Sequence, residues 1–213
     1  MAVVIINPNS TTSMTEAMLM QARRSVSGLH FEGWTSHKGP PSIQGSEDGD
    51  AATPPLLDLV DQASRSGADG IIIGCFDDTA LEEAARRAEC PVVGIGQASY
   101  HYAALRNWRF SVVTTLSVSV SIIETNIKRQ GLESRLARVR ASEVPVLELD
   151  ANPRMAGRTI VDEALRSEKH DGVSAIVLGC AGMVEVFQDV QSALSVQTID
   201  PVSCAARCMN WLT

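Results

Sequence analysis

Two cysteines, Cys75 and Cys180, occupy equivalent places in a sequence that contains a repeat. The segment GADGIIIGC at residues 67–75 reappears as GVSAIVLGC at residues 172–180, so each cysteine follows a glycine at the end of an apolar run. A thiol has an ordinary pKa of about 8.5 and can act as a base when ionised or as an acid when protonated. Two thiols facing each other across a pocket could take a proton from one face of a carbon atom and return one to the opposite face. The pattern therefore predicts inversion of a carbon centre.

The alternative role for each cysteine is purely structural, because free cysteine is among the most buried residue types. A single cysteine at a strand end favours the structural role, whereas two cysteines at equivalent positions of a repeat favour a role in function. A helix is expected to begin after each cysteine, and its first N–H groups should favour the thiolate or hold an oxyanion. After Cys75, the residues from Thr79 to Glu82 predict a capping box at the start of that helix. The two thiols should titrate as one coupled unit.

In this mechanism the two sulfur atoms do not form a disulfide. Each must lie about 3 to 3.5 Å from the reacting carbon, on opposite sides, whereas a disulfide bond is about 2 Å long. A redox protein that uses Cys75 and Cys180 as a reversible disulfide is the alternative. Cys90, Cys204 and Cys208 are expected to be structural, and no nearby pair of His or Cys completes a metal site.

Amide and hydroxyl side chains follow the same twofold pattern. Asn9 and Ser10 come after the first apolar run, and the shift that relates the two cysteines carries them onto Thr114 and Thr115. At the carboxyl end of a strand, these side chains could hydrogen-bond a ligand carbonyl or a ring N–H group. The alternative is a turn followed by a helix cap, with Ser13-x-x-Glu16 as a candidate capping box.

Short β-branched runs that alternate with amphipathic helical segments must position these residues. The runs are mainly apolar, as expected of strands buried on both faces, and they span residues 3–6, 70–74, 92–95, 110–113, 175–179 and 196–199. Alternation of this kind predicts an α/β fold with mainly parallel sheets. The repeat predicts two similar α/β lobes, residues 1–100 and 101–213, and leaves open whether the last helix packs back on the first lobe. Ligands bind beyond the carboxyl ends of such strands, so one site is expected at the seam between the lobes.

Composition excludes several classes of protein. Of 213 residues, 45% are hydrophobic and 20% are charged, which excludes a disordered chain, a coiled coil and collagen. The balance of 18 Lys and Arg against 25 Asp and Glu is unsuited to neutralising phosphates, so no nucleic acid partner is expected. No apolar run approaches the length of a membrane span, and Asn7 and Pro8 interrupt the first run before a signal peptide can form. A cytoplasmic protein with reduced thiols and no membrane partner is therefore expected.

Five motifs together resemble the hydantoin racemases of the Asp/Glu racemase superfamily. In chain order they are NPNS at 7–10, GPPSIQG at 39–45, GCFDDT at 74–79, FSVVTT at 110–115 and VLGCAGM at 177–183. The resemblance implies a two-lobed fold and a cofactor-independent 1,1-proton transfer at C5 of a 5-monosubstituted hydantoin. It also implies that Cys75 and Cys180 are the paired acid and base. The substrate pocket is then expected to contain Asn9, Ser10, Ser42, Ile43, Phe76, Thr79, Thr114, Thr115, Gly179, Ala181 and Gly182.

Some positions depart from the family pattern. Gln44 and Gln97 stand where relatives commonly carry Glu, and Ala80 stands where Gly is usual. Both cysteines are present, so the chemistry is expected to be kept. Relatives also suggest a homo-oligomer.

The charges of the motifs favour a neutral substrate ring. A free amino-acid carboxylate needs Arg or Lys, and the five motifs contain neither, with only Lys38 just before the second. Removing the C5 proton of a hydantoin spreads charge onto the C4 oxygen, where backbone N–H groups can stabilise it without a metal or pyridoxal phosphate.

Other functions stay open at this point. Allantoin racemase, whose substrate is a hydantoin with a ureido substituent, is the close rival. Arylmalonate decarboxylases keep only the second cysteine, so Cys75 counts against them. A two-lobed protein that binds a small molecule without reacting is the alternative from another class.

Overall fold

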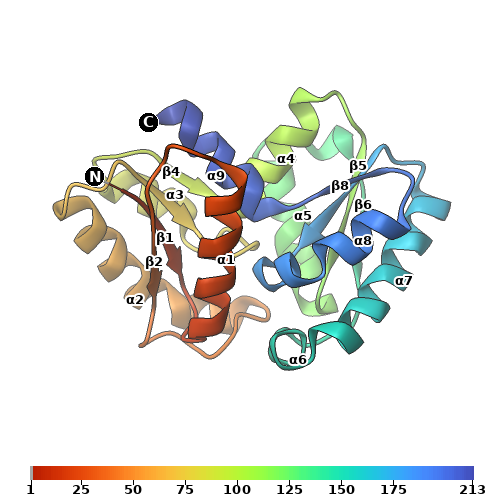
Figure 1. Cartoon of the computed structure of the whole chain (residues 1–213), viewed down its shortest axis with the longest axis horizontal. Coiled ribbons are helices and arrows are strands. Elements are labelled where there is room, and N and C mark those ends of the chain that lie inside the picture. The colour runs from red at the N-terminus through yellow and green to blue at the C-terminus, as the bar shows by residue number, and fades with distance from the viewer. Residues whose placement is uncertain (1) are drawn as a thin grey trace.

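Two four-stranded parallel sheets form the frame of the molecule. The computed structural model describes residues 2–213, and Figure 1 shows the two sheets side by side with helices around them. The first sheet has the order β2-β1-β3-β4 and the second the order β6-β5-β7-β8, with every pair parallel. The strands are β1 (Val3–Asn7), β2 (Phe31–Thr35), β3 (Gly70–Ile73), β4 (Val92–Gly94), β5 (Phe110–Thr114), β6 (Leu136–Ala141), β7 (Ala175–Gly179) and β8 (Gln197–Ile199). The predicted fold class, two similar α/β lobes with parallel sheets, is confirmed.

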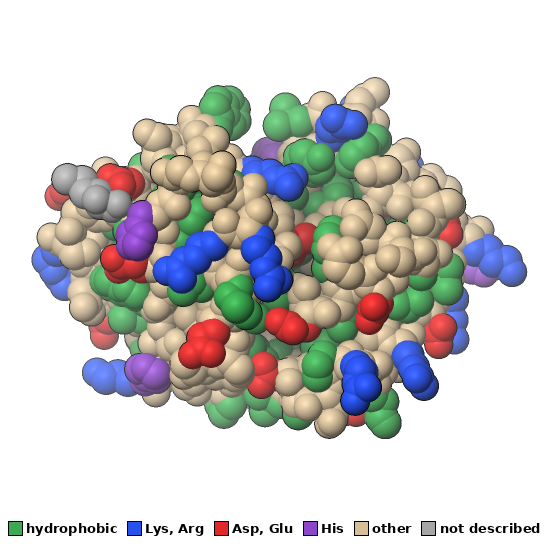
Figure 2. Space-filling view, viewed as in Figure 1, with side chains coloured by type: hydrophobic (Ala, Val, Ile, Leu, Met, Phe, Trp, Pro, Cys, Tyr) green, Lys and Arg blue, Asp and Glu red, His purple; other side chains and the backbone are tan. Residues whose placement is uncertain are grey.

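Helices cover both faces of each sheet. Besides short 3₁₀ turns at Ser117–Ser119 (η1), Glu133–Arg135 (η2) and Ala181–Glu185 (η3), they are α1 (Thr12–Ser25), α2 (Ser46–Arg65), α3 (Leu81–Arg87), α4 (Ile95–Leu105), α5 (Val120–Arg129), α6 (Val146–Ala151), α7 (Pro153–Asp171), α8 (Phe187–Ala193) and α9 (Pro201–Leu212). Within residues 2–213, none of them has the length and apolar composition that a membrane span requires. On the face shown in Figure 2, acidic and basic side chains are interspersed.

Alternation along each central strand divides the core into an inner and an outer part. In β1, Val3 and Ile5 belong to a cluster that extends into both halves of the chain, whereas Val4 and Ile6 pack against α2. In β7, Val177 joins the shared cluster, and its neighbours on the other face pack against α7 and α8. Successive strand residues point to opposite faces, so an apolar run lets one strand contact both layers.

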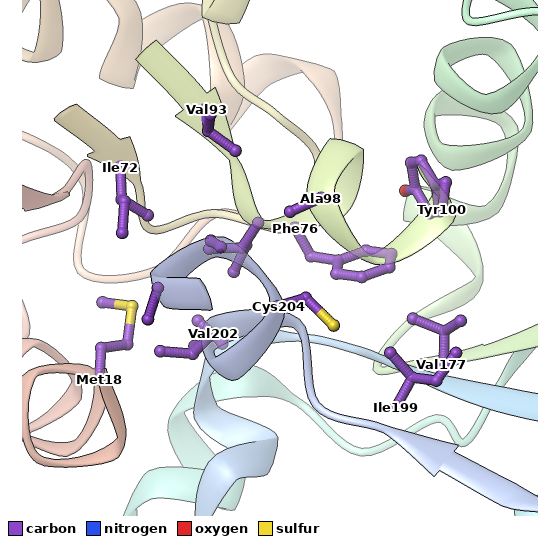
Figure 3. Packing of buried hydrophobic residues seen from close by; sticks show 14 of the residues in the cluster. Met18, Ile72, Phe76, Val93, Ala98, Tyr100, Val177, Ile199, Val202 and Cys204 are labelled. Atoms are coloured by element: carbon purple, nitrogen blue, oxygen red, sulfur yellow. The ribbon is translucent and has the colours of Figure 1, made fainter. Parts of the chain in front are cut away.

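Helix α9 ties the two halves together. It packs against α1 and α4, and Figure 3 shows Val202 and Cys204 between Met18 of α1 and Val177 of β7. The buried carboxylate of Asp200 caps α9 by accepting hydrogen bonds from the backbone N–H groups of its first turn, and it also accepts one from Gln21 of α1 at 2.8 Å. The predicted boundary between residues 100 and 101 falls inside α4, and the division at that point stays a prediction.

Both predicted capping boxes are wrong. The N-cap of α1 is Thr11, and the hydroxyl of Ser13 donates instead to Asp150 of α6 at 2.9 Å. The N-cap of α3 is Ala80 rather than Thr79, and no side chain caps that helix. In the first case, the oxygen of Asn9 already accepts the hydrogen bond from the Thr11 N–H group at 2.9 Å, so the turn is fixed by a residue that precedes the helix.

Candidate active site

The loops that follow the central strands of both sheets meet around one small cavity at the seam. Every predicted site residue lines it except Ser10, Ser42 and Thr79. Cys75 after β3 and Cys180 after β7 are both among the lining residues, and both are partly exposed, free thiols. The remaining predicted residues in the lining are Asn9, Ile43, Phe76, Thr114, Thr115, Gly179, Ala181 and Gly182.

Cys75 is held in place by a close approach of its neighbours. A Cβ atom on Gly74 would lie 2.7 Å from the sulfur of Met18 and 3.1 Å from the carbonyl oxygen of Ile6, so any other residue before the cysteine would have to displace the buried Met18 side chain. A tight turn follows, in which the N–H group of Asp78 donates to the carbonyl of Cys75 at 3.1 Å. Burial, followed by the charge of Asp77, raises the pKa of the Cys75 thiol, while the nearby Thr79 hydroxyl and the Asp77 N–H group lower it. The charge of Cys180 also raises that pKa, as expected of two thiols that share one cavity.

Cys180 is the N-cap residue of η3. Its glycine is also required, because a Cβ atom on Gly179 would lie 2.9 Å from the Cα atom of Thr114. The N–H groups of Gly182 and Met183 lower the pKa of the thiol, but burial outweighs them and raises it to about 11. The expected helix start is therefore present after Cys180 as a 3₁₀ turn.

The N–H groups expected to favour the thiolate do lower the pKa of Cys180, but they do not determine the net pKa shift of either thiol. Around Cys75, helix α3 does not begin until Leu81, so a single turn takes the place of a helix N-terminus. Around both sulfur atoms, loss of water disfavours the charged form more than the N–H groups favour it.

Side chains after β1 divide between the turn and the cavity. The oxygen of Asn9 is used by the turn, whereas its amide nitrogen lies 3.5 Å from the sulfur of Met14, another lining residue. Ser10 lies outside the cavity, and its N–H group donates to the carbonyl of Pro40 at 2.9 Å. Ser10 therefore fixes the segment 39–45, which carries Ser42 and Ile43. Ser42 is buried outside the cavity, and Ile43 lines it.

The equivalent threonines after β5 also differ from each other. The hydroxyl of Thr114 donates to the carbonyl of Gly179 at 2.9 Å, which links β5 to the strand end that carries Cys180. Thr115 is buried and lines the cavity without that structural bond. Sequence reasoning did not include five other lining residues, Met14, Gly74, Asp77, Ser119 and Val146. Gly74 and Asp77 belong to the GCFDDT motif, whereas nothing in the sequence signals Ser119 or Val146.

Adjacent carboxylates of the GCFDDT motif have different surroundings. Asp78 adopts a positive φ of 50°, and its oxygens accept hydrogen bonds from the N–H groups of Gly96 and Gln97 at 3.0 and 2.8 Å, which caps α4. Asp77 lines the cavity, where its carboxylate accepts a long hydrogen bond of 3.5 Å from Ser119. Burial raises the pKa of Asp77 to about 7. Asp78 is thus structural, and Asp77 faces the two thiols.

Contacts across the seam close the cavity. The side-chain oxygen of Gln44 accepts a hydrogen bond from the N–H group of Val146 at 3.0 Å, and Ser13 donates to Asp150. The cavity has a volume of about 30 Å³, whereas small-molecule sites usually measure roughly 300–1,000 Å³. A ring-sized ligand therefore requires the segment 39–45 and α6 to move apart.

Ala80 departs from the family pattern at a position where the backbone favours glycine. Its φ is 53°, in the left-handed region, which costs a residue with a Cβ atom about 1–2 kcal/mol. We expect Ala80→Gly to raise the free energy of unfolding by about 0.5–1 kcal/mol, because the relief of strain exceeds the added chain entropy of glycine. Urea unfolding checks this value. Ala85→Gly, at an exposed position of α3, is the matched control and should lower stability by about 1 kcal/mol; a loss of stability in both variants would contradict the interpretation.

Comparison with known proteins decides the family. The profile of the "Asp/Glu/Hydantoin racemase" family matches residues 3–209. The chain belongs to this family. It is accordingly an isomerase of the racemase type.

Among residues 2–213, no three His, Cys, Asp or Glu side chains form a group that could hold a metal ion.

Individual relatives are similar over nearly the whole chain. A hydantoin racemase of Rhizobium meliloti is 39% identical, with 97% of this chain and 86% of the relative covered. The structure of an allantoin racemase from Klebsiella pneumoniae is 34% identical and superimposes with a TM-score of 0.94, covering 99% of this chain and 86% of that one. An allantoin racemase from Pseudomonas fluorescens is 32% identical, also with a TM-score of 0.94, and covers 100% of this chain and 90% of that one.

Proposed function

We propose that this racemase interconverts the enantiomers of 5-monosubstituted hydantoins, with Cys75 and Cys180 as the two acid–base groups. The observation that carries the proposal is that two thiols from equivalent strand ends line one cavity at the seam. The named relatives, a hydantoin racemase and two allantoin racemases, support a hydantoin ring as substrate. The pocket residues are Asn9, Ile43, Phe76, Thr114, Thr115 and the segment from Gly179 to Gly182.

The proposed reaction moves one proton away from C5 and one proton onto its opposite face, with no net oxidation or reduction. One sulfur, as thiolate, takes the C5 proton, and the electron pair left at C5 is delocalised onto the C4 oxygen. The other sulfur, as thiol, then gives its proton to the opposite face of C5. A thiol whose pKa is raised gives a stronger base once ionised, which suits a weakly acidic C–H group.

Polar groups in the cavity would stabilise the charge at the C4 oxygen. The N–H groups of Gly182 and Met183 already lie at the sulfur of Cys180, and the amide nitrogen of Asn9 lies beside the cavity. Fixed donors of this kind are worth several kcal/mol where water is excluded. The reaction as proposed uses no cofactor.

Exchange of the C5 hydrogen in D₂O tests the proposal directly. We expect the protein to racemise one enantiomer of a 5-alkyl hydantoin, followed by polarimetry, and each product molecule to carry deuterium at C5, followed by NMR. Solvent deuterium should enter product faster than it enters the remaining starting enantiomer, because two groups act on opposite faces. Binding without loss of optical rotation would contradict catalysis and indicate a binding protein.

Allantoin racemisation is the second candidate, favoured by the two solved allantoin racemases. The rates of racemisation of allantoin and of an alkyl hydantoin, measured side by side, distinguish the two functions.

A cytoplasmic location and assembly into a homo-oligomer remain part of the proposal. Gel filtration with light scattering would measure the number of subunits.

A further inference from the structure

We propose that Asp77 selects hydantoins whose 5-substituent presents N–H donors, and that the substituent occupies the hollow between α2 and α5. Such substituents are ureido, ammonium and guanidinium groups. The inference rests on the proposed function, because it concerns the same reacting ring. It adds a specificity-determining residue and a subsite next to the two thiols.

The hollow adjoins the cavity that contains the cysteines. Its volume is about 500 Å³, and its walls come from the first half of α2, residues 77–80 and α5. Asp77 lines both spaces. The cavity at the cysteines has to open before it admits the ring, and a substituent on C5 that extends past Asp77 would then reach the hollow. The hollow provides space for the substituent, and Asp77 stands between the two spaces.

Thr79 supplies a second polar group beside the hollow. It is more than nine-tenths buried, it lines the hollow, and its hydroxyl lies at the thiol of Cys75, whose pKa it lowers. Among the described residues this contact with the thiol is its one polar contact, so the hydroxyl keeps capacity for a further hydrogen bond. A substituent with polar atoms that extends from the ring past Cys75 into the hollow could use that capacity.

The charges of the hollow favour donors over acceptors. The carboxylate of Asp77 has only the long hydrogen bond from Ser119, so its oxygens keep capacity for N–H groups. Asp78 lines the hollow too, but its oxygens are used by the N–H groups that begin α4. Asp50 and Arg129 also line the hollow, and both are exposed, so water screens their charges. A carboxylate substituent next to Asp77 would therefore meet a negative charge that the exposed Arg129 offsets only weakly.

Comparison of three hydantoins that differ only in the substituent tests the inference. Aminobutyl, butyl and carboxyethyl hydantoins would be assayed by polarimetry at about pH 8 with the wild type and with Asp77→Asn. We expect the wild type to prefer the aminobutyl over the carboxyethyl compound in kcat/KM by ~10- to 100-fold, as charge-assisted hydrogen bonds imply. Asp77→Asn should reduce this ratio at least tenfold. Asp58→Asn, at an exposed position of α2 outside the hollow, is the matched control and should keep the wild-type ratio.

The ratio between substrates is the decisive readout, because a general loss of activity leaves it unaltered. Asp77→Glu keeps a carboxylate and should retain the preference for the aminobutyl compound. If Asp77→Asn does not fold, Asp77→Ser, which also lacks the carboxylate, takes its place. An unchanged ratio in the folded Asn or Ser variant overturns the inference, as does a wild type with no preference. Failure of the wild type to racemise any of the three compounds would instead contradict the proposed function itself.

Discussion

Cys75→Ser and Cys180→Ser are each expected to lower the rate of hydantoin racemisation by at least ~10³-fold while the protein stays folded. Serine fills nearly the same space as cysteine, but its hydroxyl is far too weak an acid to exist as a base near neutral pH. Each sulfur reaches only one face of C5, so the remaining thiol cannot complete the inversion alone. The cavity at the seam should be preserved, since both side chains end in it rather than in the core.

The two single variants should differ in which enantiomer still exchanges its C5 proton with solvent. With one thiol left, the C5 proton of one enantiomer can still be removed and returned to the same face, so that enantiomer alone should take up deuterium from D₂O without inversion. NMR on each pure enantiomer measures this exchange. Cys90→Ser, on a half-buried cysteine outside the cavity, should racemise at the wild-type rate. Full racemisation by either cavity variant would refute the two-thiol mechanism.

Loss of the Arg140 side chain is expected to cost about 3–5 kcal/mol of unfolding free energy. Arg140 on the edge strand β6 donates to Asp171 at 2.6 Å and to Glu163 at 3.0 Å, and all three side chains are largely buried. Asp171 also accepts hydrogen bonds from Ser111 of β5 and Ser167 of α7. Arg140→Ala would therefore leave buried carboxylates without their cation. Arg138→Ala, at an exposed position of the same strand, is the control and should change stability by less than about 1 kcal/mol.

The same ion pair gives stability a defined dependence on pH. Burial alone raises the pKa of Asp171, but the hydrogen bonds and charge of Arg140, together with the two serines, lower it to about 2 from 3.8. A lowered pKa stabilises the folded state above the unfolded value of 3.8, and this contribution is lost as pH falls toward 2. The wild type should thus lose about 2 kcal/mol through this group between those pH values, and Arg140→Ala should lose less, because only the two serines remain to lower the pKa. Equal acid sensitivity of the two proteins in urea unfolding would argue against the assignment.

Six of the eight strands could be predicted from the sequence, and β2 and β6 could not. Apolar runs identify the central strands β1, β3, β5 and β7, because parallel strands between two helix layers admit few polar residues. Short runs also mark the edge strands β4 and β8, whereas β2 and β6, at the opposite edges of the two sheets, have none, and β6 carries two arginines. Their residues are partly exposed, so no apolar run marks them. The partners of Arg140 lie on α7, too far along the chain for local patterns to reveal.

Cavity residues at strand ends could likewise be predicted, because a repeat and a glycine mark them. Ser119 and Val146 come from segments with no such pattern, and only the closed arrangement of the two lobes brings them to the cysteines. The pKa shifts were missed because they depend on how much water reaches each sulfur, which the sequence does not contain. The hydroxyls of Ser10 and Thr114 donate to the carbonyls of Pro40 and Gly179, so a hydroxyl at a strand end can serve the backbone rather than a ligand.

The return of α9 to the first sheet constrains the order in which the chain can fold during synthesis. Met209 and Ala205 of α9 complete the apolar cluster that includes Met18 and Ile72, and these two residues emerge from the ribosome long before α9 does. Domains often fold as soon as they are synthesised. Here the first sheet would expose part of its apolar surface until α9 has been made, so chaperones that shield such surface should associate with the nascent chain until α9 leaves the ribosome.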